Sequence, residues 1–311
     1  MPSCPFAVRA PVQALARAAS LALGLAMAPA ASAQLINDSR EQVAFDSPEG
    51  WAMAWVTSSS LMTGFGGPPA GGPGRTYMSV ELGSIPHLSK AQQRVGFGGL
   101  KDEDLNKSPV FGRLRFGLTL PARWHAELGW TPPLRIDGAR ARDLFALAVG
   151  RSLIERERWQ WNLRLHGQHG QVEGDITCPR ALAGNPDRNV NRYGCVEAST
   201  DRIAMRYYAL ESNLAWGPAG GLRGHASLGL ARFEPVVQVQ ARSANLISRP
   251  RLSSSGEAPY VALGLSRPLS GRWEAALEAL YVPLQVERRD RAGENDPYWS
   301  LRLQLRYRSA D

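Results

Sequence analysis

The last residues of the chain alternate between apolar and polar side chains. In the segment 298–307, every second position from Trp299 to Tyr307 is apolar, and the positions between them are Ser300, Arg302, Gln304 and Arg306. A strand turns successive side chains to opposite faces, so this segment as a strand has one apolar and one polar face. As a helix it would spread its arginines around the whole surface. The pattern therefore predicts a β-strand.

The same alternation recurs along most of the chain. The other clear strand candidates are 75–83, 110–120, 124–130, 141–153, 159–168, 203–216, 222–230, 258–267 and 273–281. Two weaker candidates, 41–46 and 51–60, precede them. Together they predict an all-β chain with twelve strands, or ten if the first two lie outside the sheet.

The connections between these segments alternate in length. Short polar turns are expected at 121–123, 155–158, 217–220 and 270–272, and longer connections at 131–140, 171–202, 238–257 and 286–296. Short turns at one end and long loops at the other are typical of outer-membrane barrels, whose short turns face the periplasm. Residues 84–109 form a further polar connection that either holds a short helix near Ser89–Arg94 or caps the mouth of the barrel.

Four tryptophans support a membrane location. Trp124, Trp159, Trp216 and Trp273 each lie close to a different short turn. Indole rings favour the membrane–water interface, where both the apolar ring and the polar N–H are satisfied. These residues are predicted to form an interface girdle, which a soluble barrel would not need. The expected fold is thus a closed antiparallel transmembrane β-barrel.

The N-terminus reads as an export signal. Arg9 and Arg17 precede an apolar core at 18–28, and Ala31-Ser32-Ala33 supplies a small-residue cleavage pattern. We expect residues 1–33 to be a cleaved signal peptide and 34–311 to be the barrel domain. Residues 34–62 form either the first hairpin or an interior plug, and the alternation at Trp51, Met53 and Trp55 favours the hairpin.

Cysteine content and charge narrow the chemistry. Cys178 and Cys195 remain after cleavage, and in an exported chain they are expected to form one disulfide in the longest loop. The histidines are scattered, which argues against a metal site, and no cofactor motif occurs. The net charge is +8, but export argues against a nucleic-acid partner and leaves anionic lipid headgroups or an anionic solute. Mean hydropathy is −0.26, which a barrel tolerates because only alternate residues face lipid.

The chain resembles the outer-membrane β-barrel proteins of Gram-negative bacteria in its signal peptide, alternating strands, aromatic girdle and strand-like C-terminus. The resemblance covers nearly all of the mature chain, and no motif selects a subfamily. It implies an outer-membrane location, contact with outer-membrane lipids and lipopolysaccharide, and insertion by the barrel assembly machinery. In that class the final strand usually ends on an aromatic residue. Tyr307 is the counterpart, although four more residues follow it.

The polar faces of the strands would line the lumen. We expect six arginines and five glutamates there: Glu81, Arg113, Arg115, Glu127, Arg164, Glu211, Arg223, Glu274, Glu278, Arg302 and Arg306. Such residues either fill and stiffen a narrow barrel as Arg–Glu pairs or form a charged constriction that selects a solute.

An enzyme is the less favoured alternative. His125, Glu127, His166 and His225 fall on polar faces of different strands, so a His–Glu–Ser grouping is conceivable. No G-x-S-x-G or H-E-x-x-H motif occurs, so no catalytic residue is assigned. The sequence leaves three hypotheses open: a narrow Arg/Glu-lined lumen for small solutes, a non-conducting structural or surface-interaction barrel, and a lipid-directed hydrolase at the rim.

Overall fold

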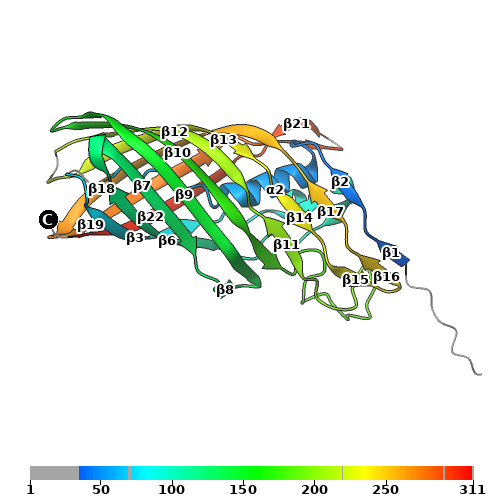
Figure 1. Cartoon of the computed structure of the whole chain (residues 1–311). Helices are drawn as coiled ribbons and strands as arrows, with labels where there is room; N and C mark the ends of the chain where they lie inside the picture. The colour runs from blue at the N-terminus through cyan, green and yellow to red at the C-terminus, as the bar shows by residue number, and fades with distance from the viewer. Residues whose placement is uncertain (1–34, 69–71, 219, 290, 310–311) are drawn as a thin grey trace, which may run out of the picture. The chain divides into compact units, whose positions relative to one another are not determined.

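Ten antiparallel strands close into a barrel in the computed structural model, which describes residues 35–68, 72–218, 220–289 and 291–309 (Figure 1). The wall strands are β3 (Thr76–Ser84), β6 (Val110–Thr119), β7 (Trp124–Thr131), β9 (Ala139–Glu155), β10 (Trp159–Gly174), β12 (Tyr207–Trp216), β13 (Arg223–Phe233), β18 (Gly256–Ser270), β19 (Trp273–Val282) and β22 (Tyr298–Arg308). The ring closes where the first of them, β3, pairs with the last, β22, for example Glu81 with Gln304. The predicted signal peptide, residues 1–33, lies outside the described residues.

Buried and exposed side chains alternate along the wall strands, as the alternation of polar and apolar residues in the sequence predicted. In β3, Tyr77, Ser79 and Glu81 are buried, whereas Met78 and Val80 are exposed. The other wall strands repeat this pattern, so large apolar side chains such as leucine, valine and phenylalanine cover the outside of the ring. An exposed apolar band of this extent is suited to hydrocarbon rather than water.

The prediction of twelve wall strands is wrong, and the alternative of ten holds. Residues 51–60 are not a strand: most of them belong to helix α2 (Pro48–Ser58). Ser47 caps this helix by accepting a hydrogen bond from the Gly50 N–H, and Pro48 occupies its first turn. Residues 41–46 also lie outside the wall, because only β2 (Arg40–Gln42) is extended and it pairs in parallel with β17 (Arg251–Ser253).

The reason for this error is that the helix is apolar on all sides. It buries Trp51, Met53 and Trp55 as well as the alanines between them. A short apolar run without a polar face does not distinguish a strand from a buried helix by its periodicity. No helix in the described part of the chain is long and apolar enough to cross a membrane.

The two ends of the barrel differ. At one end, here the short-turn end, four tight connections join the strands: η1 (Pro121–Arg123), 156–158, 217–222 and 271–272. The chain enters β3 and leaves β22 at this end, where Tyr77 is paired with Arg308. The other end, here the long-loop end, carries every long connection.

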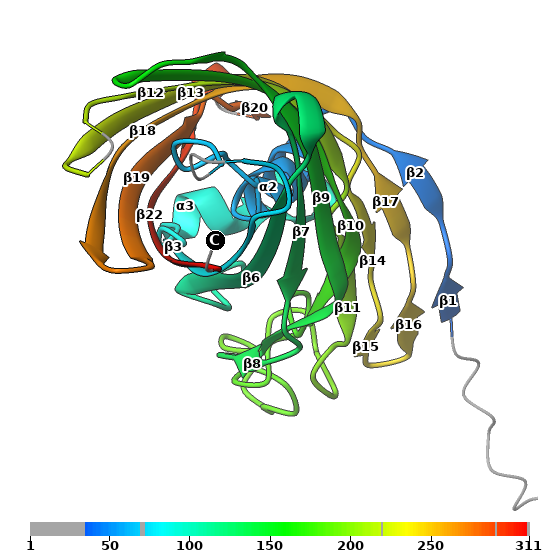
Figure 2. The same ribbon diagram turned by 60° about the vertical axis from the view of Figure 1, so that its left-hand side comes forward.

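The long connections contain short elements of their own. These are α3 (Lys90–Gln93), β4 (Arg94–Val95), α4 (Gly96–Gly99), β5 (Lys101–Asp102), β8 (Arg135–Ile136), β11 (Asp201–Ala204), β14 (Val236–Gln238), β15 (Ala241–Ser243), β16 (Leu246–Ser248), β20 (Gln285–Arg288) and β21 (Arg291–Asn295). The expected short helix near Ser89–Arg94 is α3, capped by Ser89. Strands β11, β14, β17 and β2 continue the sheet outward from the end of β10 (Figures 1 and 2). Strand β1 (Leu35–Asn37) belongs to a separate sheet with β16 and β15.

The predicted disulfide is confirmed: Cys178 and Cys195 are bonded, with their Cα atoms 5.7 Å apart. Both side chains are buried with Val239 and Ala241 in a small core of their own. Residues 175–200 contain little regular secondary structure, so this core and the covalent bond hold the longest loop against the outer strands.

Replacing Cys178 and Cys195 together by serine is expected to loosen that loop alone. A cross-link closing a segment of this length contributes ~3 kcal/mol to the stability of what it closes. Limited proteolysis should cut residues 179–194 faster in the variant, while both proteins keep the heat-modifiable gel migration of a folded barrel. Equal cleavage rates, or loss of the barrel in the variant, would contradict this assignment.

Candidate functional site

The lumen is occupied by the chain itself. Helix α2 lies inside the ring of strands, and residues 59–68 follow it as an irregular segment toward the short-turn end (Figure 2). We call residues 48–68 the plug. Leu61, Met62, Thr63 and Phe65 are at most 1% exposed, so this part of the chain is as buried as the core of a soluble protein.

The upper part of the plug, helix α2, has an apolar environment. Trp55 packs edge-on against Tyr298 at a centroid distance of 5.3 Å, and both belong to a cluster with Phe233 and Val282. The Trp51 indole N–H donates to the carbonyl of Asp296 at 2.8 Å. A helix satisfies most of its backbone polar groups internally, so it needs no polar partners from the wall.

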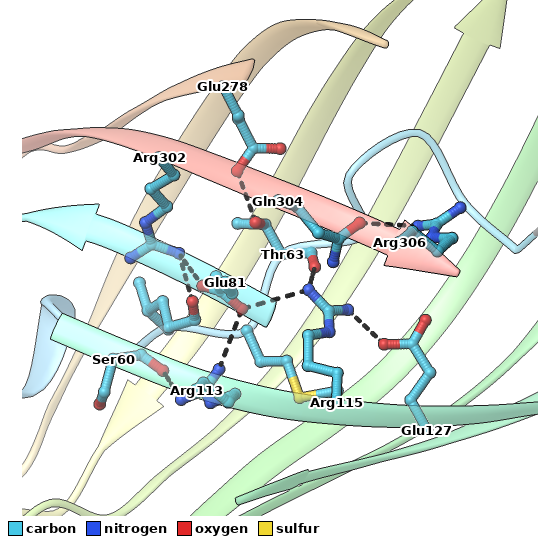
Figure 3. A network of polar contacts seen from close by, with 12 residues as sticks. Ser60, Thr63, Glu81, Arg113, Arg115, Glu127, Glu278, Arg302, Gln304 and Arg306 are labelled. Atoms are coloured by element: carbon cyan, nitrogen blue, oxygen red, sulfur yellow. Dashed lines mark hydrogen bonds and ion pairs between the residues drawn. The ribbon is translucent and has the colours of Figure 1, made fainter. Parts of the chain in front are cut away.

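The lower part of the plug needs such partners, and the wall supplies them. Residues 59–68 form no regular hydrogen-bond ladder, and a buried carbonyl without a donor is costly. Arginines from the wall donate to these carbonyls. Arg113 donates to Ser60 at 2.5 Å and Arg115 to Thr63 at 3.0 Å (Figure 3). The other donors are Arg164 to Met62 at 3.3 Å, Arg306 to Gly67 at 3.1 Å, and Arg302 to Ser58, Ser59 and Leu61.

The same arginines pair with carboxylates of the wall. Glu81 lies 3.3 Å from Arg115, 3.7 Å from Arg302 and 3.9 Å from Arg113. Glu127 contacts Arg115 and Arg164, and Glu211 accepts from Arg164 at 2.9 Å. Buried charges are costly unless they are paired, and each arginine and glutamate named here has an oppositely charged partner within 4 Å. Each guanidinium named here therefore joins the plug backbone to a wall carboxylate, and Figure 3 labels three of them, Arg113, Arg115 and Arg302, with Glu81 and Glu127.

The predicted lumen residues are not all alike in position. Nine are buried: Glu81, Arg113, Arg115, Glu127, Arg164, Glu211, Glu278, Arg302 and Arg306. Arg223 and Glu274 are half-buried near the short-turn end, where Glu274 lies 3.3 Å from Arg306. Glu278 differs from the other buried glutamates in its hydrogen-bond partner. It accepts from the Thr63 hydroxyl of the plug at 2.5 Å instead of pairing with an arginine.

Sequence reasoning missed the plug partners of these residues. Gly64-Phe65-Gly66-Gly67 shows no strand alternation, and it is a packed part of the lumen. Gly67 has φ +89°, and a Cβ there would lie 2.4 Å from the Asn162 amide nitrogen. A Cβ at Gly64 would lie 2.8 Å from a Glu211 oxygen. The glycines therefore allow the chain to lie close to the polar wall.

The lumen histidines lie among these same groups. His166 is 2.8 Å from the Tyr260 hydroxyl, and His225 is 3.4 Å from a Glu278 oxygen. His125 is fully buried. The described residues contain no group of three or more His, Cys, Asp or Glu side chains arranged to hold a metal ion.

The four girdle tryptophans stand at strand ends beside the short turns. Trp124, Trp159 and Trp273 begin β7, β10 and β19, and Trp216 ends β12. All four are between 38% and 49% exposed. Trp159 and Trp216 are direct cross-strand partners with ring centroids 6.4 Å apart.

Changing Arg302 to glutamine is expected to destabilise the protein by ~3–5 kcal/mol, because it takes the charged donor from three buried plug carbonyls and removes one of the three arginines beside Glu81. Urea unfolding of the reconstituted protein, followed by tryptophan fluorescence, measures this loss. Arg267→Gln is the matched control, since Arg267 is exposed on β18. Equal stability of the two variants would show that the contacts of Arg302 are dispensable.

No protein-family model matches the chain, and no curated protein matches it. Solved structures with a similar fold include the translocator domain of autotransporter NalP from Neisseria meningitidis, with 11% identity, TM-score 0.44 and coverage of 85% of this chain and 99% of that one. The outer membrane protease OmpT from Escherichia coli has 9% identity, TM-score 0.38 and coverage of 76% and 94%. Ail from Yersinia pestis has 10% identity, TM-score 0.31 and coverage of 76% and 99%. The closed antiparallel ring of strands that the sequence predicts is seen in the structure of the chain itself.

Proposed function

We propose that this protein is an outer-membrane barrel closed by its own plug, and that it acts as a non-conducting barrel presenting a binding surface at its long-loop end. The observation that carries the proposal is the donation of wall arginines to the carbonyls of residues 58–67. These contacts fill the lumen with backbone and use the charges that would otherwise select a solute.

The membrane location is supported by the outside of the barrel. Its apolar band and the tryptophans at the short-turn rim suit a bilayer and its interface. By the usual orientation of such barrels, the short-turn end faces the periplasm and the long-loop end faces the medium. Export by a cleaved signal peptide and insertion by the assembly machinery belong to this proposal.

The surface at the long-loop end is more ordered than simple loops would be. The sheet extension of β11, β14, β17 and β2 continues from β10, and the disulfide fastens the longest connection to it. Ordering in the absence of a ligand lowers the entropic cost of binding one, which favours a recognition role.

The two other hypotheses have less support. A pore for small solutes requires the plug to leave, and each departing carbonyl would lose a charged donor. A hydrolase requires a substrate to reach a nucleophile and its base. The candidate histidines His125, His166 and His225 are at most 4% exposed and lie within the packed lumen.

Single-channel recording in planar bilayers tests the closed lumen. We expect the native protein to be silent, and a variant lacking residues 34–68 to conduct steadily because its polar lumen is then water-filled. Heat-modifiable migration must first show that the shortened barrel folds. Steady conductance by the native protein would contradict the proposal.

A milder change keeps the test decisive if the shortened chain does not fold. The double variant Arg113→Gln/Arg302→Gln retains the plug but removes donors to four of its carbonyls. Transient openings are expected in this variant and not in the exposed-site control Arg267→Gln. A double variant as silent as the control would mean that these arginines do not hold the lumen closed.

Antibody labelling of intact cells tests the orientation. The N-terminal strand β2 pairs with β17 at the long-loop end, so epitope tags after residue 34 and after Asp187 should both be accessible from outside. A tag after Gly271, in a short turn, should be reached only after permeabilisation. The reverse pattern would place the long loops in the periplasm.

A further inference from the structure

An apolar cavity of about 150 Å³ lies beside the plug at the long-loop end. Trp55 and Val56 of α2 form one side, and Phe111, Leu144 and Met205 line the side of the wall. Ser59 also lines the cavity, and its carbonyl accepts from Arg302, so the cavity begins where the arginine network ends. None of the wall arginines that donate to the plug lines the cavity.

The cavity lies beside β7, which with 8 residues is the shortest strand of the wall. Strand β7 ends at Thr131, whereas its neighbour β9 continues outward to Ala139 and β6 to Val110. Residues 132–138 cover the resulting notch. Leu134 and Val110 line the cavity and are 64% and 40% exposed, so the cavity reaches the surface of the barrel through this notch.

A break in alternation makes the lining apolar. In β9, Leu144 and Ala141 are both buried, with two exposed residues between them, and the exposed Asp143 has φ +49°. The pairing of β9 with β10 shifts register at the same level. Without this bulge Arg142 would point inward. With it, Ala141 faces the cavity and Arg142 faces out, where it pairs with Glu173.

At the mouth of the cavity, Arg135 and Arg140 stand outside the ion pairs formed by the described residues around them. Lys107 is neutralised by Asp104 and Asp175, and Glu173 by Arg142 and Arg202. Arg140 also lines the cavity, and its only side-chain hydrogen bond within the described residues is from Nε to the Pro133 carbonyl. Its direct cross-strand partner on β8 is Arg135, which is exposed, and its partner on β10 is Glu173, which already pairs with Arg142 and Arg202. Two cations placed directly opposite each other repel, and an anion between them removes that cost.

We propose that this cavity binds an anionic amphiphile, with its alkyl end against Trp55 and Met205 and its head group between Arg135 and Arg140. A dry apolar cavity of about 150 Å³ accommodates a group the size of benzene, so it receives roughly six carbons of the tail. The remaining tail leaves through the notch. The ligand can come from the outer leaflet or from solution, because the notch lies on the outer surface of the wall.

Methyl-labelled methionine NMR of the protein in phosphatidylcholine nanodiscs tests this. The probe is octanoate, and octyltrimethylammonium has the same tail with the opposite charge. Met205 lines the cavity, Met62 lies deeper in the plug, and Met78 is exposed on the outside of the wall. We expect a saturable shift of Met205 alone, at about tenfold lower concentration for octanoate than for the cation. Parallel, unsaturable shifts of Met205 and Met78 would mean membrane partition only and would overturn the proposal.

Two substitutions separate the tail site from the head site. Ala141→Leu fills the cavity and should abolish the Met205 response, while heat-modifiable migration confirms folding. Arg140→Gln should keep the response but remove the preference for octanoate. Arg151→Gln is the matched control: Arg151 is on the same strand at the short-turn end, and its Nε also donates to a carbonyl, that of Ala122. An unchanged preference in Arg140→Gln, or a lost one in Arg151→Gln, would refute the head site.

Changing the lipid composition of the nanodiscs shows whether the amphiphile comes from the membrane or from solution. In nanodiscs containing phosphatidylglycerol, a lipid that reaches the site raises the octanoate concentration needed for half the Met205 shift. An unchanged titration assigns the site to amphiphiles from solution. These titrations do not measure conductance, so they test the amphiphile site independently of whether the plug closes the lumen.

Discussion

A run of backbone carbonyls buried in the lumen governs the rest of this structure. Residues 59–68 cross the interior outside any helix or strand pairing that would provide hydrogen-bond donors for their carbonyls. A buried carbonyl without a donor costs about 1–3 kcal/mol. Arginine meets this requirement well, because one guanidinium has five N–H donors and can serve a carbonyl and a carboxylate together. The cations then require Glu81, Glu127 and Glu211, so the charged lumen follows from the course of the plug.

The same constraint divides the interior into two levels. Where the plug is helical, its backbone needs little from the wall, and inward positions such as Phe233, Val282 and Tyr298 are apolar or aromatic. Where it is irregular, inward positions are arginine, glutamate and amide side chains. The amphiphile cavity lies at the upper level, since only there can an inward-facing gap remain dry.

The sequence predicted the wall well because membrane and lumen impose opposite polarity on successive residues. All ten strong segments are strands, and the disulfide followed from two cysteines in an exported chain. For residues 34–62 the sequence leaves a first hairpin and an interior plug open, and the favoured hairpin is wrong because α2 has no polar face to reveal its period. The binding partners of Arg113 and Arg302 could not be predicted, since they are backbone carbonyls that any sequence carries. The cavity depends on a bulge at Asp143 that the alternation does not indicate.

Hydrogen–deuterium exchange of the reconstituted protein, read by mass spectrometry over residues 48–68, tests the central claim most directly. If the wall donors hold this segment in the lumen, its amides should exchange as slowly as those of β10 and β22, including the irregular part from Ser59 onward. Exchange of residues 59–68 at the rate of an unfolded chain, while the strands stay protected, would show that the plug is not held and would contradict the account.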